Sequence, residues 1–241
     1  MKYYILAFPL LLRTIIPKSC FDSQSNFDID FNYLYPWGSD HNGAARMDKS
    51  KVSIANKILT LTASPSSNEK PASSGGKVIP VKYRSGTVYA KEKFNVSRTG
   101  GYDFVADFKA TTTKGTWPAF WLTAVDGWPP EIDLAEWKGS GKISFNTFNT
   151  SSQVAAKDVN YPNPGDWHTC KTELRDLNGK DLGVKFYMDG KLVTTQTGRG
   201  FVGKPMWLIL DLQMEGSSGS PGPAGNTLFQ VRNLEALSYN P

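Results

Sequence analysis

The sequence predicts an all-β fold, a sandwich of two antiparallel sheets, and three observations support this prediction. Twenty-two Gly and fifteen Pro among 241 residues provide for many turns. Seven Trp, ten Tyr and thirteen Phe provide large side chains for a core. Apolar and polar residues alternate with a period of two in one segment after another, and no segment has a helical period of convincing length. About a dozen strands without intervening helices indicate two packed sheets.

Strands are expected from the first third of the chain to its end. The single segments are 85–96, 102–111, 118–125, 131–137, 142–149, 168–174, 205–215 and 231–237. Two hairpins add to them, 52–63 with a turn near Asn56-Lys57 and 183–195 built on Asp189-Gly190. Asp-Gly between alternating segments is a strong signal for a tight hairpin turn. Segments 64–74 and 216–225 are rich in Ser, Gly and Pro, and we expect them to be surface loops.

Segment 205–215 indicates where a functional surface lies. One side of this strand carries only apolar residues, namely Met206, Leu208, Leu210, Leu212 and Met214. The other side carries Trp207, Ile209, Asp211, Gln213 and Glu215. Apolar residues on one side and polar and aromatic residues on the other predict a sheet with one face in the core and one face in water.

Most of the excess of basic over acidic residues comes from the N-terminus of the chain. The 27 basic residues exceed the 22 acidic ones, but Lys2, Arg13 and Lys18 lie in the first twenty residues, which contain no acidic residue. We expect residues 1–20 to be a signal peptide, because Lys2 precedes an apolar run, 3–12, that is too short to span a membrane. Arg13 interrupts that run and no small-residue cleavage site follows, so a buried strand is the alternative.

A secreted protein without residues 1–20 would be nearly neutral, which argues against nucleic-acid binding, and it would have no membrane anchor. The sequons at Asn95 and Asn149 are meaningful only in a secreted protein. The two cysteines, Cys20 and Cys170, cannot staple a fold of this size. An inert buried Cys170 is favoured over a Cys20–Cys170 disulfide.

Three acidic residues lie within six positions of the expected strand 131–137. Glu131 and Asp133 share one face of a regular strand, whereas Glu136 points to the other. A β-bulge near Leu134-Ala135 would return Glu136 to the first face. Like charges this close raise the pKa of at least one of them. A retaining glycosidase needs such a pair, with one carboxylate ionised as the nucleophile and the other protonated as the general acid.

A solvated acidic strand or a calcium site is the alternative for these three acids. Solvated strands rarely have Trp on both flanks, and here Trp128 precedes the acids and Trp137 follows them. The two histidines and two cysteines form no metal-binding pattern, and no glycine-rich phosphate loop occurs. We therefore expect no metal and no cofactor.

The motif Glu-x-Asp-x-x-Glu136, after Trp117-Pro-Ala-Phe-Trp121, resembles glycoside hydrolase family 16 in its bulged, laminarinase-like branch. Weaker similarities from about residue 30 onward support it, at Tyr83-Arg-Ser-Gly86, at 166–190 and at Pro205-Met-Trp-Leu-Ile-Leu210. The resemblance implies a concanavalin-A-like β-jelly-roll sandwich over 21–241, as a single catalytic domain. It also implies cleavage of internal β-glycosidic bonds with retention.

The resemblance also implies roles for single residues. Glu131 is the expected nucleophile, Glu136 the acid/base and Asp133 the residue that tunes Glu131. Trp121 and Trp128 match tryptophans that stack on sugar rings, while Trp117 matches either a sugar contact or the core. Arg84 and His168 lie in the weaker motifs and are further candidates for substrate binding, although a structural hydrogen bond is favoured for His168. His41 receives no role.

The chain departs from the family pattern at three places. Asn149 stands where a His is usual, and Asp211 and Gln213 replace an Asn and a small residue, so all three are candidates for an altered subsite. A glycan on the Asn149 sequon would block the cleft. Leu228-Phe-Gln230 occupies the region where the family often has a calcium-binding Asp, which predicts no calcium.

Three functions remain open at this stage. The first is a secreted, monomeric endo-β-glycanase on a β-1,3-linked or mixed-linkage polysaccharide, with glucan placed before galactan. The second is transglycosylation on the same glycans. The third is a lectin-like binding module, which would have no need of three crowded carboxylates.

Overall fold

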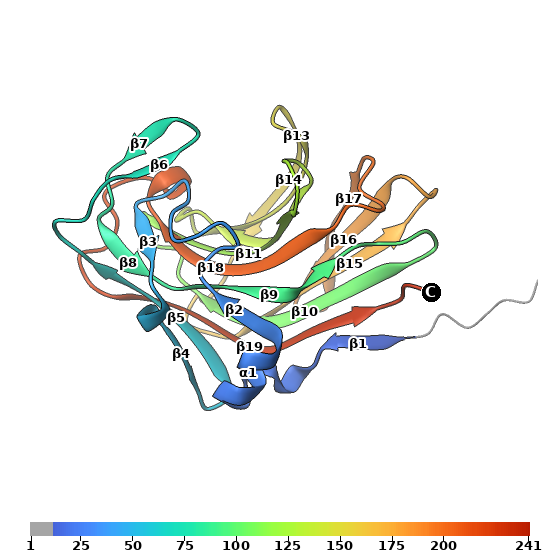
Figure 1. Cartoon of the computed structure of the whole chain (residues 1–241), viewed down its shortest axis with the longest axis horizontal. Helices are drawn as coiled ribbons and strands as arrows, with labels where there is room; N and C mark the ends of the chain where they lie inside the picture. The colour runs from blue at the N-terminus through green and yellow to red at the C-terminus, as the bar shows by residue number, and fades with distance from the viewer. Residues whose placement is uncertain (1–11) are drawn as a thin grey trace, which may run out of the picture.

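Two large β-sheets stack on each other in the computed structural model, which describes residues 12–241 (Figure 1). The larger sheet has ten strands and the smaller has seven. Every pairing within them is antiparallel except that of β3 with β8, which is parallel. The expected jelly-roll sandwich of two antiparallel sheets is therefore confirmed, with this one parallel contact as an addition.

The ten-stranded sheet has the order β17-β16-β15-β10-β19-β5-β8-β3, with β1 on β19 and β4 on β5. Its strands are β1 (Arg13–Ile16), β3 (Ala45–Met47), β4 (Val52–Ala55), β5 (Ile58–Pro65), β8 (Tyr83–Ser85), β10 (Gly101–Ala110), β15 (His168–Asp176), β16 (Leu182–Met188), β17 (Lys191–Gly198) and β19 (Thr227–Ser238).

The seven-stranded sheet has the order β14-β13-β12-β11-β18-β9-β2. Its strands are β2 (Phe31–Tyr33), β9 (Thr87–Phe94), β11 (Thr116–Ala124), β12 (Glu131–Trp137), β13 (Lys142–Thr150), β14 (Gln153–Asn160) and β18 (Met206–Met214). A separate hairpin consists of β6 (Ala72–Ser74) and β7 (Lys77–Ile79). The helical elements are α1 (Gln24–Asp30) and three 3₁₀ turns, Lys18–Phe21, Lys49–Lys51 and Gly216–Ser218.

Aromatic side chains fill the space between the two sheets. Phe108 of β10 lies 5.5 Å from the ring of Trp137 on β12 and 5.7 Å from that of Phe229 on β19, measured between ring centroids. Phe145 of β13 meets Phe186 of β16 at 5.5 Å. All five rings are fully buried. Rings of this size bury large apolar areas and hold the sheets together.

The strand predictions are confirmed at the two hairpins. Strands β4 and β5 turn at Asn56 and Lys57, which both have positive φ, and β16 and β17 turn at Asp189-Gly190. The sequence analysis did not expect α1, the short strands β2 and β3, the hairpin β6–β7 or the edge strand β14. Segment 64–74, expected as a loop, begins within β5 and ends in β6.

The segment from Arg13 to Cys20 is part of the folded sandwich. Strand β1 pairs with β19, Ile16 is buried, and the Cys20 thiol donates to the Leu234 carbonyl at 3.6 Å. Most of the expected signal-peptide pattern, residues 1–11, lies outside the described residues. Lys18 forms an ion pair with Glu235, so the excess positive charge does not belong to a leader alone.

Both cysteines are buried free thiols, so the structure contains no Cys20–Cys170 disulfide. Burial raises the pKa of each thiol far above its usual range, which keeps both protonated and unreactive. Among the helices of residues 12–241, none is long and apolar enough to cross a membrane.

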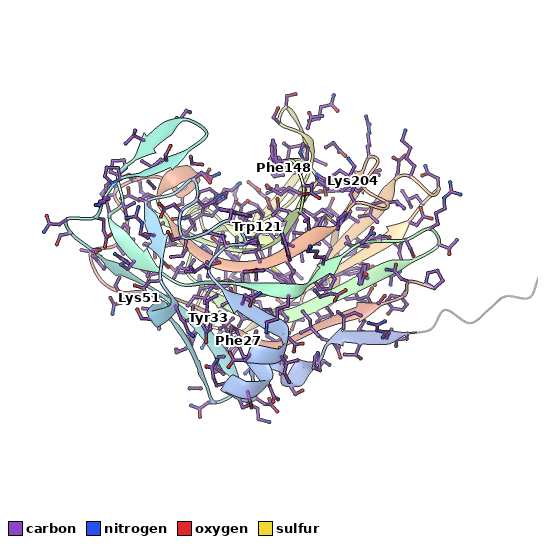
Figure 2. All side chains as sticks on the ribbon, viewed as in Figure 1. Phe27, Tyr33, Lys51, Trp121, Phe148 and Lys204 are labelled. Carbon is purple, nitrogen blue, oxygen red and sulfur yellow. The ribbon has the colours of Figure 1, made fainter. Side chains whose placement is uncertain are left out.

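The seven-stranded sheet presents its outer face to a space between two projecting hairpins, β6–β7 and β13–β14 (Figure 1). The side chains of Trp121 and Phe148 lie on this face, whereas Phe27 lies at the opposite end of the view (Figure 2). Strand β18 alternates as the sequence predicts, with Met206, Leu208 and Leu210 buried in the core. The polar side of this strand faces the same space.

Candidate active site

A β-bulge in β12 brings the three carboxylates together. Trp121 on β11 pairs with Asp133 and Phe120 pairs with Ala135, so Leu134 is the extra residue. The pairing of β12 with β13 shifts at the same place, between Asp133 and Glu136. Leu134 and Ala135 are fully buried. The bulge expected near Leu134-Ala135 is confirmed, and it returns Glu136 to the face that carries Glu131 and Asp133.

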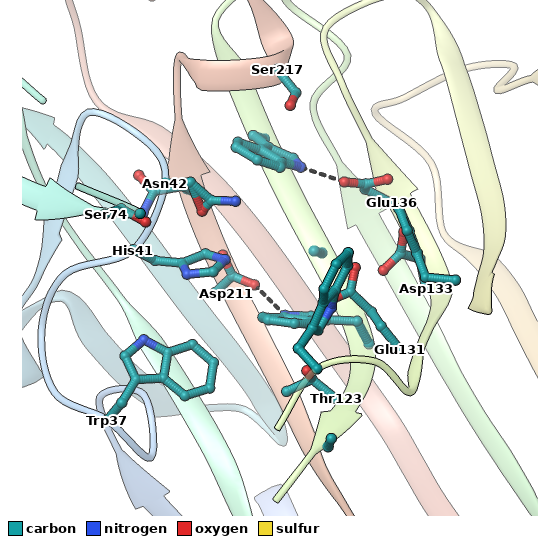
Figure 3. Close-up of a pocket in the computed structure, with 18 of the residues that line it drawn as sticks. Trp37, His41, Asn42, Ser74, Thr123, Glu131, Asp133, Glu136, Asp211 and Ser217 are labelled. Atoms are coloured by element: carbon teal, nitrogen blue, oxygen red, sulfur yellow. Dashed lines mark hydrogen bonds between the residues drawn. The ribbon is translucent and has the colours of Figure 1, made fainter. Parts of the chain in front are cut away.

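The carboxylates line a cleft of about 810 Å³. Its walls contain side chains from β11, β12, β13 and β18 and from the N-terminal segment that precedes β3. Figure 3 shows Glu131, Asp133 and Glu136 in a row on one side, with His41, Asn42 and Trp37 on the other. The remaining lining residues include Trp117, Trp121, Trp128, Lys138, Phe148, Asp211 and Gln213.

Glu131 is held by the indole of Trp128. The Trp128 Nε1 donates to Glu131 Oε2 at 2.8 Å, and the Trp128 ring is 47% exposed, so one side of it remains free on the cleft. Burial raises the pKa of Glu131 to about 7, with a further contribution from the nearby charge of Glu136. Glu131 is therefore largely protonated below neutral pH.

Glu136 is surrounded by donors. Trp117 Nε1 donates to Oε1 at 2.6 Å, while Asn146 Nδ2, at 3.0 Å, and Lys138 Nζ, at 2.7 Å, both contact Oε2. Donors, and a cation above all, favour the ionised form of a carboxylate. Glu136 is thus the carboxylate of the cleft with the most donors around it.

Asp133 lies between these two and is fully enclosed. Its Oδ2 accepts from Asn146 Nδ2 at 2.8 Å, so one amide spans the bulge and contacts both Asp133 and Glu136. Burial, and then the charges of Glu136 and Glu131, raise the pKa of Asp133 well above its usual range. A protonated Asp133 limits the repulsion within the group of three.

A fourth carboxylate, Asp211 of β18, lies beneath the cleft. It accepts from Trp121 Nε1 at 2.8 Å and from the Tyr35 hydroxyl at 2.9 Å, and burial raises its pKa to about 7. The His41 ring lies 5.6 Å from the ring of Trp121 at an interplanar angle of 26°, which covers Trp121 and leaves it 6% exposed. Trp121 is thus part of the cleft floor.

Trp37 is an aromatic residue of the cleft that the sequence analysis did not consider. Its ring stacks on Tyr35 at 5.1 Å with an angle of 4°, its Nε1 donates to the Asp40 carbonyl at 3.2 Å, and it is 47% exposed. These contacts fix the ring and leave one face toward the cleft. Its position depends on the path of the N-terminal segment, which local sequence patterns do not reveal.

Gln213 lines the cleft but uses its amide within the protein. Its Oε1 accepts from the backbone N–H of Ala45 at 2.8 Å and of Met214 at 2.9 Å, and its Nε2 donates to the Ala45 carbonyl at 3.2 Å. A Cβ at Gly43 would overlap the Gln213 side chain, so glycine is required there. Gln213 thereby fixes the chain that carries His41 and Asn42 into the cleft.

Three predicted substrate-binding residues lie away from the cleft. Arg84 of β8 contacts Glu69 at 2.6 Å through Nε and Asp48 at 3.3 Å through a terminal nitrogen. His168 belongs to the other sheet, where its Nδ1 lies 2.8 Å from Asp189 Oδ2. Both side chains are thus held by carboxylates outside the cleft, and the third residue is Asn149.

Asn149 also points away from the carboxylates. Its Nδ2 donates to the Thr197 carbonyl at 3.1 Å and its Oδ1 accepts from the Arg199 N–H at 2.6 Å. It therefore joins β13 to the end of β17. In the strand that carries it, Phe148 lines the cleft and lies 5.8 Å from Trp128 between ring centroids.

Lys138 and Asn146 are the polar residues of the site that the sequence analysis missed, and alternation could have found both. Once the bulge turns Glu136 toward the cleft, Lys138 follows on the same face two positions later. Likewise Ser144, Asn146 and Phe148 share one face of β13, with the apolar Ile143 and Phe145 on the other face. Among the residues that the structure describes, no group of His, Cys, Asp and Glu is arranged to hold a metal ion.

Comparison with known proteins agrees with this geometry. The sequence pattern of glycosyl hydrolases family 16 matches residues 42–218. A galactan endo-β-1,3-galactanase from Flammulina velutipes is 48% identical over 224 residues, which are 92% of this chain and 89% of that protein.

Solved structures share the fold. An endo-1,3-β-glucanase from Streptomyces sioyaensis superposes with a TM-score of 0.68 at 19% identity, covering 89% of this chain and 91% of that one. A non-specific endo-β-1,3(4)-glucanase of family GH16 gives 0.71 at 18% identity, covering 97% and 93%. With its bulged carboxylate strand and these similarities, the chain belongs to glycosyl hydrolase family 16.

Proposed function

We propose that this glycoside hydrolase cleaves internal β-1,3 linkages of a galactan and retains the anomeric configuration. The observation that carries the proposal is the bulge of β12, which brings Glu131 and Glu136 onto one face of an aromatic-lined cleft. The sequence analysis placed glucan before galactan. The 48% identical relative is named a galactanase, and this supports the reverse order.

In the proposed reaction Glu131 attacks the anomeric carbon while Glu136 protonates the leaving oxygen. A covalent glycosyl ester with Glu131 results, and the shortened chain leaves. Glu136, now ionised, takes a proton from water, whose oxygen attacks the anomeric carbon and releases Glu131. The Trp128 indole orients Glu131 for the attack, and Asn146 keeps Asp133 and Glu136 at a fixed separation.

Trp37 and Trp128 supply the binding surface for sugar rings in this proposal. Each is 47% exposed, and Figure 3 shows Trp37 on the side of the cleft opposite the carboxylates. Galactose rings present C–H faces that pack on aromatic rings.

We also propose that the protein is secreted and acts as a monomer. The charged and apolar pattern of the first twelve residues supports a leader. Because β1 begins at Arg13 and Cys20 is buried in the sandwich, we propose that the leader ends before Arg13 and not after Cys20.

The test is digestion of β-1,3-galactan and of laminarin, a β-1,3-glucan, by the wild-type protein, with linkage analysis of the products. We expect galactan to be degraded to mixed oligosaccharides, the first of which are β-anomers by NMR. The variant Glu131→Gln should lose activity, and Glu136→Gln should lose about 10²–10⁴-fold in turnover. Glu92→Gln, on β9 and outside the cleft lining, is the control and should be unchanged.

Full turnover by Glu131→Gln would contradict the mechanism. Products longer than the starting oligosaccharide would identify transglycosylation as the main reaction. Tight binding of galactan without cleavage by the wild type would identify a lectin-like module.

A further inference from the structure

Lys138 is a cation in direct contact with the expected acid/base and has no role in the mechanism above. Its Nζ lies 2.7 Å from Glu136 Oε2 and its side chain is 32% exposed. Lys138 lies just after β12, between Trp137, the last residue of that strand, and Gly139. Its backbone is therefore held by the sheet on the Trp137 side only. Burial, the largest single effect, lowers the pKa of Lys138, but the charge and hydrogen bond of Glu136 together with the charges of Asp133 and Asp158 raise it overall, so the side chain stays cationic.

The contacts of Glu136 conflict with the first step of the proposed reaction. A general acid must be protonated, yet Trp117 and Asn146 each donate to Glu136 and Lys138 adds a cation. Meanwhile burial favours the protonated form of Glu131, which must be ionised to attack. The proton therefore has to move from Glu131 to Glu136 before the reaction can begin.

Of the three donors, Lys138 is the one that can leave. Trp117 and Asn146 belong to strands β11 and β13, whose backbones are fixed by pairing on both sides. Lys138 has a long side chain beyond the end of its strand and lines the cleft. A sugar ring bound beside Glu136 would compete with the ammonium group for the same oxygen.

We propose that Lys138 is a displaceable counter-ion that keeps Glu136 ionised until substrate binds and so controls when Glu136 becomes an acid. Substrate displaces the ammonium group, Glu136 takes up a proton, and Glu131 or Asp133 releases one, so the number of protons in the cleft is unchanged. This inference rests on the proposed function, because it assigns Lys138 to the same reaction. Lys138 acts through Glu136 and is a positioning residue.

Other charged groups face this pair. Glu131 and Asp133 lie on the same strand, Asp211 approaches from β18, and Asp158 of β14 faces Lys138 and accepts from the Ser144 hydroxyl at 2.8 Å. Strand β11 contributes the neutral Trp117. Each of these four carboxyl groups, when ionised, opposes a negative charge on Glu136, and Lys138 is the one Lys or Arg among the cleft-lining residues that the structure describes.

The first experiment is the pH dependence of kcat/KM on galactan for Lys138→Met and Lys138→Arg. An opposite charge at this distance typically moves a titration by 1–3 units, and Glu136 is the carboxylate that ionises first in this proposal, so Lys138→Met should carry the acidic limb upward by about 1–3 pH units. Lys138→Arg keeps the charge and should keep the wild-type limb. Lys142→Met, an exposed lysine at the start of β13, is the control and should match the wild type.

The second experiment needs no activity. Protein labelled with ¹³C at the glutamate carboxyl groups is titrated by NMR, and the Glu136 signal is identified by its loss in Glu136→Gln. Its midpoint should rise in Lys138→Met and not in Lys138→Arg. Equal midpoints in wild type and Lys138→Met, with both proteins folded, would overturn the proposal, whereas an inactive wild type would overturn only the proposed function.

Discussion

Asp211 in the cleft floor connects the cleft-lining face of the sheet to the N-terminal segment. Its two oxygens accept from Tyr35 before β3 and from Trp121 on β11. It pairs across the sheet with Ala119, which in turn pairs with Glu136, so Glu136 and Asp211 lie two strands apart on the same face. A charge on Asp211 would therefore oppose a charge on Glu136.

The stability of the protein should depend on pH through Asp211. Burial raises its pKa from 3.8 to about 7, so between those values the native state holds a proton that the unfolded chain has released. The free energy of unfolding then falls as pH rises from about 4 to 7. Asp211→Asn cannot ionise, and it should match the wild type at pH 4 and exceed it at pH 8 by on the order of 4 kcal/mol.

Urea unfolding at both pH values measures this difference. The Asn side chain can still accept from Trp121 and can donate to the Tyr35 oxygen, so the contacts of the floor are retained. A difference in unfolding free energy that is the same at pH 4 and pH 8 would contradict the assigned titration.

At the scale of elements, strand β12 was predictable and its surroundings were less so. Three acids at positions 131, 133 and 136 can share a face only if a residue is inserted, so the bulge followed from the sequence. By contrast, the local sequence pattern could not predict the direction of three side chains, those of Arg84, His168 and Asn149. Each is engaged by a residue distant in the chain, Arg84 by Glu69 for example.

Short elements were missed for physical reasons. Helix α1 has seven residues and Phe27 is the one that is buried, so the sequence shows no repeated apolar spacing there, although Ser23 caps the helix by accepting from the Asn26 N–H at 3.1 Å. The hairpin β6–β7 turns at Gly75-Gly76 within a Ser-rich segment that is also typical of a loop. Trp37 and His41 enter the cleft only because Gln213 and Asp211 fix the segment around them.

The hairpin β16–β17 offers a test of turn chemistry. Gly190 has a φ of 76° and a Cβ there would meet nothing within 4 Å, so the cost of Gly190→Ala is conformational alone. We expect a loss of about 1–2 kcal/mol in the free energy of unfolding. Gly165→Ala, at an equally open position whose φ is not positive, should cause no loss. Equal stabilities of the two variants would show that the turn does not require glycine.

At the scale of the whole molecule, one N-terminal segment both closes the sandwich and builds the cleft wall. Strand β1 pairs with β19, and Phe21, Phe27 and Phe31 pack together at centroid distances of 5.4 to 6.5 Å. The same segment continues to Tyr35 and Trp37 in the cleft. Loss of the contacts between β1 and β19 should therefore also disturb the cleft residues Tyr35 and Trp37.

Two truncated proteins test where the folded domain begins. A chain that starts at Arg13 keeps β1 and should unfold at the temperature of the full-length protein. A chain that starts at Phe21 loses the pairs of β1 with β19 and the buried side chains of Ile16 and Cys20. Burial of one such aliphatic side chain contributes about 1.5–3 kcal/mol.

For a chain of this size that loss lowers the melting temperature by about 5–10 °C. Because the segment continues into the cleft wall, KM for galactan should rise in the shorter protein while the longer one stays unchanged. Sequencing of the secreted protein should place its first residue at or before Arg13. A mature protein that begins at Phe21 with full stability would show that β1 is dispensable and that the leader extends through Cys20.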